Sequence, residues 1–286
     1  TPTLTLSNAD TASYSSGSGS TGILYTTTVA EGDTTSADLS VSAINPTAGG
    51  ATMKDGNNNP ISTTVSGGDL GSVTVDGDAP DLASVAAADD AYGVGETISI
   101  TVTWDEAVVV TGTPTLTLSN AATATYSSGT GSSALVFTYT VAEGNTASAD
   151  LSVSSYAGTI TDAAGGAAAA ATGDLGSVTV DGDAPDLVSV VDAGDAPLGV
   201  GETHTITVTW DEAVVVTGTP ALTLSNGASA PYTSGTTSTA LVFTYTVAEG
   251  DSDSNDLGVT AYTGTISDVA GGAAAATGTV DLGSVT

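Results

Sequence analysis

The chain has 286 residues, of which 32 are Asp or Glu and only one, Lys54, is a Lys or Arg, so its formal charge at pH 7 is −31. This balance excludes nucleic acid and anionic membrane surfaces as partners, because phosphate binding requires Lys and Arg. The absence of Cys excludes disulfides, thiolate nucleophiles and cysteine-bound zinc. No stretch of 18 consecutive apolar residues and no basic leader followed by an apolar run occurs, so neither a membrane span nor a signal peptide is predicted in this segment. The acidity and the wealth of Thr, Ser, Gly and Ala favour an exported surface protein over a cytosolic enzyme.

Internal repetition organises the whole sequence. TWDEAVVVTGTP begins at Thr103 and again at Thr209, 106 residues later, and DLGSVT occurs three times at a similar spacing, first at Asp69. A unit of this size is a domain with its own core, since solenoid periods run from about 20 to 50 residues. The first copy has no counterpart of residues 75–112, which indicates that the chain belongs to something longer. We therefore predict a partial repeat 1 over residues 1–74 and two complete repeats, repeat 2 over 75–179 and repeat 3 over 180–286.

Repeat 1 also departs from the other copies near its end. Residues 53–69, MKDGNNNPISTTVSGGD, replace an alanine-rich stretch and contain the only Lys and the only Met. Asp55-Gly56 and Asn59-Pro60 are turn formers, so we expect a local loop variant there.

The segment VDGDAPDL joins the repeats, at residues 75–82 and unchanged at 180–187, and is called the hinge below. Gly77 gives backbone freedom and Pro80 fixes φ, which predicts a stiffened acidic connection. On an extended backbone, residues i and i+2 share one face about 6 to 7 Å apart, so Asp76 and Asp78 can turn oxygens towards one cation. Calcium fits best because it accepts several oxygen ligands in flexible geometry; a solvated acidic turn is the alternative.

Within the complete repeats, apolar residues alternate with Thr and Ser. Residues 98–104 have Ile98, Ile100, Val102 and Trp104 on one face, and residues 135–141 repeat the pattern. The alanine run 167–171 predicts a loop or a single helical turn, because so short a helix is marginal in water. Seven short strands in about 105 residues predict an all-β fold, with one two-sheet sandwich per repeat. Further strands are expected at 82–85, 108–110, 115–118, 151–156 and 175–179.

The segments TWDEAVVVTGTPTLTLSN, FTYTVAEG, TITDAAGG and DLGSVTVDGDAP carry a resemblance that covers the whole chain. They resemble the tandem Ig-like extender domains of giant bacterial surface adhesins, of the RTX-type and biofilm-associated kind. The resemblance implies a linear array of Ig-like sandwiches, secreted to the bacterial cell surface, that spaces an adhesive domain away from the cell. The glycine-rich nonapeptide of RTX proteins is absent. By motif match, the resemblance implies calcium at the junctions, held by Asp76, Asp78 and Asp81 and again by Asp181, Asp183 and Asp186.

An alternative from another class is a subunit of an extracellular filament or surface layer. In that case strands of another chain would complete repeat 1, and the partners would be further copies of the protein. The implied partners of an extender are instead the neighbouring repeats of the same longer chain.

Other acidic clusters give weaker signals. The EF-hand template fails, because counting Asp76 as position 1 puts Asp81 at position 6 and Ala87 at position 12. A second acidic group follows the Phe/Tyr strand, and we interpret it as a solvated hairpin loop in preference to a calcium site, since its composition varies between copies. Its members are Glu31, Asp33 and Asp38, then Glu143, Asn145 and Asp150, then Glu249, Asp251, Asp253 and Asp256.

Nothing in the sequence indicates an enzyme. Adjacent strand residues point to opposite faces, so Asp105 and Glu106 are not expected to act as one carboxylate pair. The same residues recur at Asp211 and Glu212, and an active site copied into every repeat would be unusual, so a structural or metal-binding role is favoured for them. Asp162 and Asp268 precede Gly-Gly turns and are interpreted as turn formers, not ligands. The only histidine, His204, is interpreted as a partly buried strand-end residue, and Trp104 and Trp210 as core.

Overall fold

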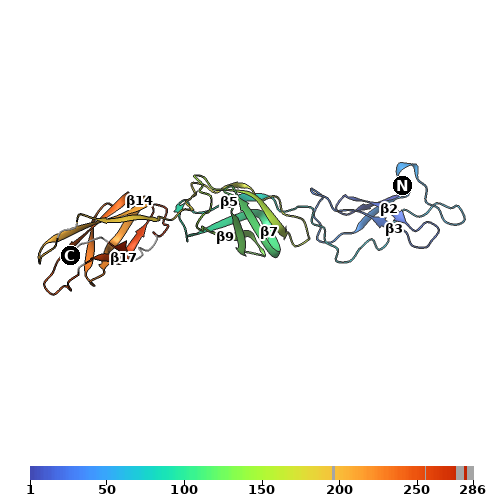
Figure 1. Cartoon of the computed structure of the whole chain (residues 1–286). Coiled ribbons are helices and arrows are strands. Elements are labelled where there is room, and N and C mark those ends of the chain that lie inside the picture. Colours follow the sequence, from blue (N-terminus) through green and yellow to red (C-terminus); the bar gives the residue numbers. More distant parts are fainter. Residues whose placement is uncertain (195–196, 255, 275–279, 282–286) are drawn as a thin grey trace.

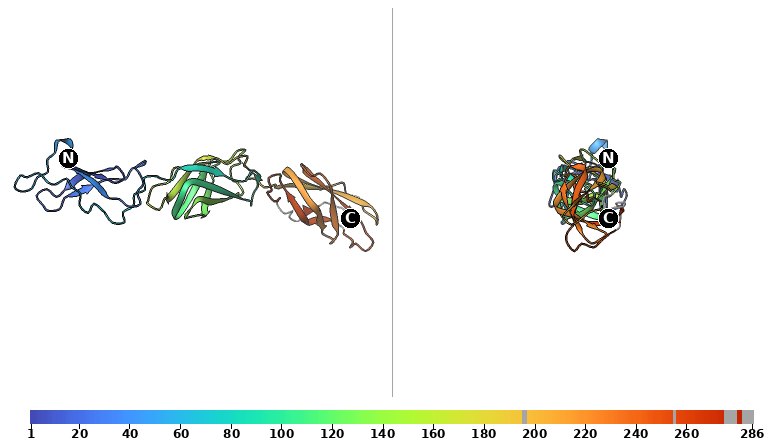
Figure 2. Two further views of the ribbon diagram at one scale, coloured as in Figure 1. Left: turned by 180° about the vertical axis from the view of Figure 1, so that it is seen from behind. Right: turned by 60° about the vertical axis from the view of Figure 1, so that its left-hand side comes forward.

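The computed structural model describes residues 1–194, 197–254, 256–274 and 280–281. These residues form three β-rich bodies in a row, with repeat 2 between repeat 1 and repeat 3 (Figure 1). The bodies overlap when the molecule is viewed along its long axis (Figure 2), so the array is close to straight. Apart from one 3₁₀ turn at Ala48–Gly50, every regular element in the described part of the chain is a β-strand. The predicted all-β class is therefore confirmed.

Repeat 1 is a small antiparallel sheet with a small core. Its strand order is β3-β2-β1-β4. Residues 53–69 contain no strand and only isolated bridges, between Lys54 and Pro60 and between Asp69 and Ser40, as expected of a loop variant. The strands of this sheet are β1 (Thr3–Leu6), β2 (Thr11–Ser16), β3 (Leu24–Thr26) and β4 (Val41–Asn45). Its core consists of the buried side chains of Leu6, Ala12 and Leu39, together with Val75 at the start of the hinge.

Repeat 2 is built around one very long strand, β7 (Thr97–Leu118). Its first half pairs with β5 and β9, and its second half pairs with β8 and β10, so a single strand belongs to both layers of the sandwich. The strand bends between the two halves, where the β9 register shifts between Thr103 and Val108. The other strands are β5 (Leu82–Ala86), β6 (Ala91–Tyr92), β8 (Thr123–Ser128), β9 (Ser132–Thr140), β10 (Ser152–Thr161), β11 (Gly173–Asp174) and β12 (Thr179–Val180).

Three strands predicted separately over residues 98–118 are thus one continuous element. No Gly or Pro interrupts residues 97–111. The backbone N–H of Asp105 donates to the carbonyl of Asp81 at 3.0 Å, which keeps the bend hydrogen-bonded. The chain changes layers here by bending, not by forming a loop.

The alternating pattern does mark the core. Trp104 is 1% exposed and Phe137 is fully buried, and Tyr126 packs edge-on against Phe137 with ring centroids 5.9 Å apart. Burying side chains of this kind contributes about 1.5 to 3 kcal/mol each. In the alanine run, Ala168 and Ala171 are buried and no helix forms, because Ala167 bridges to Thr161 in extended conformation.

Repeat 3 has the same architecture around β14 (Thr203–Leu224), which pairs with β13, β15, β16 and β17. Trp210 is 1% exposed. His204 occupies the place of Ile98, is 4% exposed, and lies 3.0 Å from Asp192 Oδ2 through its Nε2, so it is a buried strand-end residue as predicted. The predicted end of this repeat, residues 282–286, lies outside the described residues. The remaining strands are β13 (Leu187–Asp192), β15 (Ser229–Ser234), β16 (Ser238–Thr246), β17 (Gly258–Ser267) and β18 (Val280–Asp281).

The hinge is anchored to the repeat that precedes it. β12 pairs in parallel with β6, Val180 bridges to Ser148, and the N–H of Asp181 donates to the carbonyl of Tyr92 at 2.9 Å. A Cβ at Gly182 would lie 2.0 Å from the carbonyl oxygen of Asn145. Glycine is therefore required by close backbone packing, whereas the sequence suggested only conformational freedom. Gly77 meets the carbonyl oxygen of Asp33 at the same distance.

Candidate metal centre

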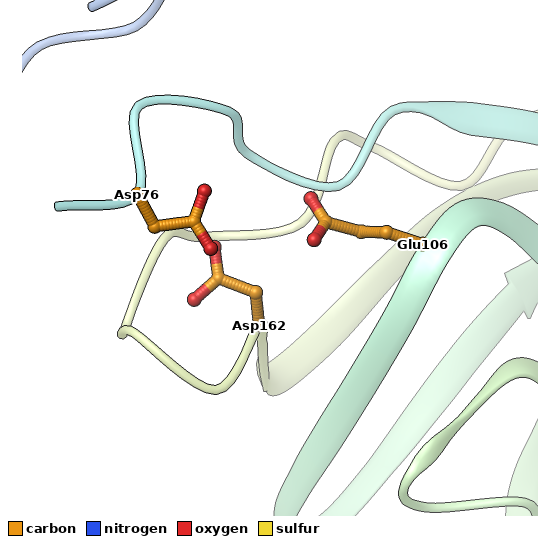
Figure 3. A group of neighbouring side chains, drawn as sticks. All are labelled: Asp76, Glu106 and Asp162. Atoms are coloured by element: carbon orange, nitrogen blue, oxygen red, sulfur yellow. The ribbon is translucent and has the colours of Figure 1, made fainter. Parts of the chain in front are cut away.

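Two clusters of three carboxylates lie at the two junctions. Within each cluster, one oxygen of each residue lies within 4.8 Å of the oxygens of the other two. Figure 3 shows the first cluster, in which the carboxylates of Asp76 and Asp162 lie together and that of Glu106 faces them. The first cluster is Asp76, Glu106 and Asp162, and the second is Asp181, Glu212 and Asp268.

The fold brings these residues together from three distant segments. Asp76 belongs to the hinge, Glu106 lies at the bend of β7, and Asp162 directly follows β10. The bend of β7 and the end of β10 lie side by side, because Val109 pairs with Thr161. The hinge crosses that end of the sandwich, so its first aspartate meets the other two.

The turn after β10 fixes the orientation of Asp162. Its Oδ1 accepts the backbone N–H groups of Ala164, Gly165 and Gly166, at 2.6, 2.6 and 2.9 Å. A Cβ at Gly166 would lie 2.3 Å from Oδ2, so only glycine fits beside this carboxylate. One oxygen is therefore held by the turn, and the other remains for the cluster.

Asp268 is held in the same way in the second cluster. Its Oδ1 accepts the N–H of Gly272 at 3.0 Å, and a Cβ at Gly272 would lie 2.3 Å from its Oδ2. Asp268 is 3% exposed, and its Oδ2 is buried with no hydrogen-bond partner. Oε1 of Glu212 is also buried without a partner. Buried polar atoms in this state are rare unless an ion or a water satisfies them.

The clusters concentrate negative charge without a protein cation. Burial and the neighbouring carboxylates of Asp162 and Asp76 raise the pKa of Glu106. Burial, together with Asp181 and Asp268 among others, raises the pKa of Glu212 to about 7. Such shifts arise when like charges share a poorly solvated site, and a bound cation would reverse them.

Burial also raises the pKa of Asp268, although the N–H groups of its turn oppose the shift. The single lysine cannot neutralise either cluster, because Lys54 donates to Asn58 in repeat 1.

The donor set fits a hard divalent cation. All six side chains offer carboxylate oxygens, and calcium accepts six to eight oxygens at about 2.3 to 2.6 Å, which allows ligands up to roughly 5 Å apart around one ion. Neither cluster contains His, so the nitrogen and sulfur ligands that zinc prefers are missing. Three carboxylates leave coordination positions for water or backbone carbonyls.

Of the predicted hinge ligands, only the first of each hinge joins a cluster. Asp76 and Asp181 do so, whereas Asp78 and Asp183 are exposed and donate their own N–H groups to the carboxylates of Asp76 and Asp181, at 3.4 and 3.2 Å. The hinge turns locally through these bonds. The carboxylates of Asp78 and Asp183 stay outside the clusters, although their charges contribute to the raised pKa of Glu106 and Glu212.

The third hinge aspartate has a different contact. The N–H of Asp81 donates to Asp105 Oδ1 at 2.9 Å, and the N–H of Asp186 donates to Asp211 Oδ1 at 2.8 Å. The side chains of Asp81 and Asp186 are not part of either cluster. Asp105 thus holds the hinge backbone while Glu106 turns to the cluster, in agreement with the prediction that the two do not act as a pair.

Sequence reasoning placed four of the cluster members in no specific site. For Glu106 and Glu212 it favours a structural or metal-binding role without naming partners, and for Asp162 and Asp268 a turn-forming role; the two aspartates do form turns, and they also enter the clusters. The available signal was that Trp-Asp-Glu and Asp-x-x-Gly-Gly recur, like the hinge motif, in both complete repeats.

The second acidic group serves as loop and hinge support. Asn145 Oδ1 accepts the Tyr139 hydroxyl at 2.8 Å, and Asp251 Oδ2 accepts the Tyr245 hydroxyl at 2.7 Å. Asp and Asn interchange because an acceptor oxygen is needed, not a charge. Glu143 binds the hinge, its Oε2 accepting the N–H of Ala184 at 3.2 Å. Within the described ranges, no three members of this group converge as the two clusters do.

Comparison with known protein-family models and with curated proteins finds no match to this chain. Among the residues that the structure describes, no helix has the length and apolar character needed to cross a membrane.

Proposed function

We propose that the chain is part of the extender region of a secreted bacterial surface adhesin, in which calcium stiffens the junctions between Ig-like repeats. The second cluster supplies the observation that carries this proposal. Asp181 is bonded to repeat 2 through its N–H, whereas Glu212 and Asp268 belong to the body of repeat 3. An ion held by all three ties the two repeats together.

The ion would act by removing repulsion and adding a link. Without it, the three carboxylates of a cluster repel one another, and the hinge aspartate is pushed away from the repeat that follows. With it, the free energy of binding is added to the folded state. At a calcium concentration of about 100 times Kd, this amounts to roughly 2.7 kcal/mol per site.

The arrangement of the bodies supports a spacer over an enzyme. In repeat 2 the chain enters at one end of the sandwich and leaves at the other, so each added repeat lengthens the rod (Figure 1). Both three-carboxylate clusters lie at the junctions between repeats, where a bound ion would link neighbouring repeats. The large negative charge keeps such rods apart from one another and from anionic surfaces.

Small-angle scattering of the full chain, with and without millimolar calcium, tests the proposal. We expect calcium to increase the maximum dimension and narrow the spread of shapes. Asp181→Asn combined with Asp268→Asn should remove the response of the second junction. The matched control is Asp183→Asn, an exposed residue of the same hinge outside the cluster, which should respond like the wild type. A scattering profile that ignores calcium would contradict the calcium lock.

A filament or surface-layer subunit is the second candidate function. Repeat 1 exposes several large apolar side chains, including Leu24 at 55%, Val29 at 46% and Leu70 at 46%, and strands from another chain could cover them. The mass of the protein across a concentration series separates the two candidates. A monomer at all concentrations favours the extender, and concentration-dependent assembly favours the filament.

A further inference from the structure

Two loops from consecutive repeats meet backbone to backbone at the second junction. Residues 93–96 of repeat 2, here the brace loop, lie against residues 268–272 of repeat 3, here the glycine turn. A Cβ at Gly93 would lie 2.2 Å from the nitrogen of Gly272, 2.9 Å from its Cα and 3.0 Å from the carbonyl carbon of Ala270. All three nearest atoms belong to repeat 3, and Gly93 is buried. Only a residue without a side chain permits this approach.

A second contact lies beside the first. The carboxylate of Glu96 lies 2.9 to 3.0 Å from the Cβ position of Gly271. The backbone nitrogen of Val94 lies 3.4 Å from the Cβ position of Gly272. The brace loop therefore covers the glycine turn along its last two residues.

The glycine turn is the element that holds Asp268. The N–H of Gly272 donates to Asp268 Oδ1 at 3.0 Å, and the Cβ position of Gly272 is 2.3 Å from Oδ2. The atoms that repeat 2 touches are thus the atoms that orient a member of the second cluster.

We propose that the brace loop of one repeat is the docking surface for the glycine turn of the next repeat, and that this contact positions Asp268 for the cation. The inference rests on the proposed function, because it assigns a positioning residue, Gly93, to the same site. The partner that fits the surface is the Asp-x-x-Gly-Gly turn of another repeat of this kind.

The first cluster shows the turn without a brace loop. Repeat 1 contains no counterpart of residues 91–96. A Cβ at Gly165 would meet nothing within 4 Å, whereas the equivalent Gly271 meets Glu96. Gly166 is half-buried and the equivalent Gly272 is buried. The burial of the turn at the second junction therefore comes from repeat 2.

Repeat 3 shows the brace loop without a turn. Its residues 199–202 keep the same internal bond, since Glu202 Oε2 accepts the N–H of Gly199 at 2.7 Å as Glu96 Oε2 accepts that of Gly93 at 3.1 Å. Yet Gly199 is exposed, and the nearest atom to its Cβ position is Glu202 Oε2 at 3.7 Å. Val200 is 69% exposed, whereas the equivalent Val94 packs partly against the core of repeat 2. The loop has its shape before docking, as a preformed surface requires.

Calorimetric titration of the full chain with calcium chloride tests the inference, using Gly93→Ala and its matched control Gly199→Ala. We expect Gly93→Ala to weaken binding at the second cluster by about tenfold or more, the range seen when an outer-shell partner of a metal ligand is lost. The first cluster lies at the other end of repeat 2, so its unchanged affinity reports that repeat 2 is folded. Gly199→Ala should leave both sites unchanged. Adding Asp162→Asn to each variant silences the first cluster and assigns the remaining heat to the second.

Equal affinity of Gly93→Ala and the wild type at both sites would overturn the inference and leave the calcium proposal intact. Loss of both sites would mean that the variant unfolds repeat 2. In that case the variants Glu96→Ala and Glu202→Ala are compared, because they remove atoms without adding any. Weaker calcium binding at the second cluster in Glu96→Ala alone supports the proposed docking of the brace loop. Equal calcium affinity of the two variants at that cluster rejects it. A wild-type chain that binds no calcium would remove the proposed function and this inference with it.

Discussion

The two junctions contain the same three residue types but differ in how deeply these are enclosed. In the first, burial raises the pKa of Glu106, and among the described residues no carboxylate oxygen there is buried without a partner. In the second, the pKa of Glu212 rises to about 7, and Glu212 Oε1 and Asp268 Oδ2 are buried without partners. The contact between a brace loop and a glycine turn is present only at the second junction. The ligands of a site therefore come from the hinge and the repeat after it, whereas its enclosure comes from the repeat before it.

Removing one ligand charge should have the largest effect and should act at one junction only. Asp162→Asn and Asp268→Asn preserve an acceptor for the turn but remove a charge from the cluster. Each should lower calcium affinity at its own junction by at least about a hundredfold, beyond the range for outer-shell changes. Calorimetric titration would show one site lost and the other kept. Loss of both sites by one substitution would show that the junctions are coupled.

Calcium should stabilise the repeats unequally. At about 100 times Kd, the expected 2.7 kcal/mol corresponds to a rise in Tm of roughly 10 to 20 °C for a domain of about 100 residues. Repeats 2 and 3 each contain a cluster, and repeat 1 contains none. Hydrogen exchange resolved by repeat should therefore show calcium-dependent protection in repeats 2 and 3 and none in repeat 1. A uniform gain would indicate counterion screening instead of binding at the clusters.

The stability of metal-free repeat 3 should fall as the pH rises. Folding raises the pKa of Glu212 from 4.5 to about 7, so between these values the folded state binds more protons than the unfolded state. Stability contributed by that proton is complete below about pH 4.5 and is lost as the pH rises through 7. Saturating calcium replaces the proton and should abolish the decline. Thermal unfolding from pH 5 to 8 would reveal it, and a rise in metal-free stability over this range would contradict the enclosure of Glu212.

The hinge contact that is identical at both junctions should give a small and equal effect. Asp105 and Asp211 accept hinge N–H groups at 2.9 and 2.8 Å from exposed positions. Alanine at either position should cost about 1 kcal/mol, or about fivefold in calcium affinity at its junction. Titrations of the two variants should agree. Unequal losses would mean that the enclosure difference extends to the hinge backbone.

Much of the fold follows from local pattern, because a buried strand face imposes a period of two. Ile98, Ile100, Val102 and Trp104 were placed in the core by alternation alone, and all are at most 1% exposed. The continuity of β7 was not predictable in this way. The bend at Asp105 depends on hydrogen bonds to a hinge more than 20 residues earlier in the chain.

Only part of the candidate site could be predicted from the sequence, again because residues distant in the chain meet in the fold. Asp76 and Asp181 lie in a motif whose exact recurrence is visible in the sequence. Glu106 and Asp162 reach Asp76 only because the bend of β7 and the end of β10 lie beside the hinge, which is a property of strand pairing across the sandwich. Local reasoning therefore favoured Asp78, the nearest acidic neighbour in sequence, over residues that are near in space.

The division of ligands between hinge and following repeat has a consequence for how such chains can change length. A segment that starts at one hinge and stops just before the next encodes a whole cluster, as residues 75–179 do with Asp76, Glu106 and Asp162. Unequal recombination between identical hinge sequences would therefore insert or delete complete cassettes, and no cassette would be left with a fragment of a site. A stretch that is repeated without change is then also a safe place for the gene to be cut and rejoined.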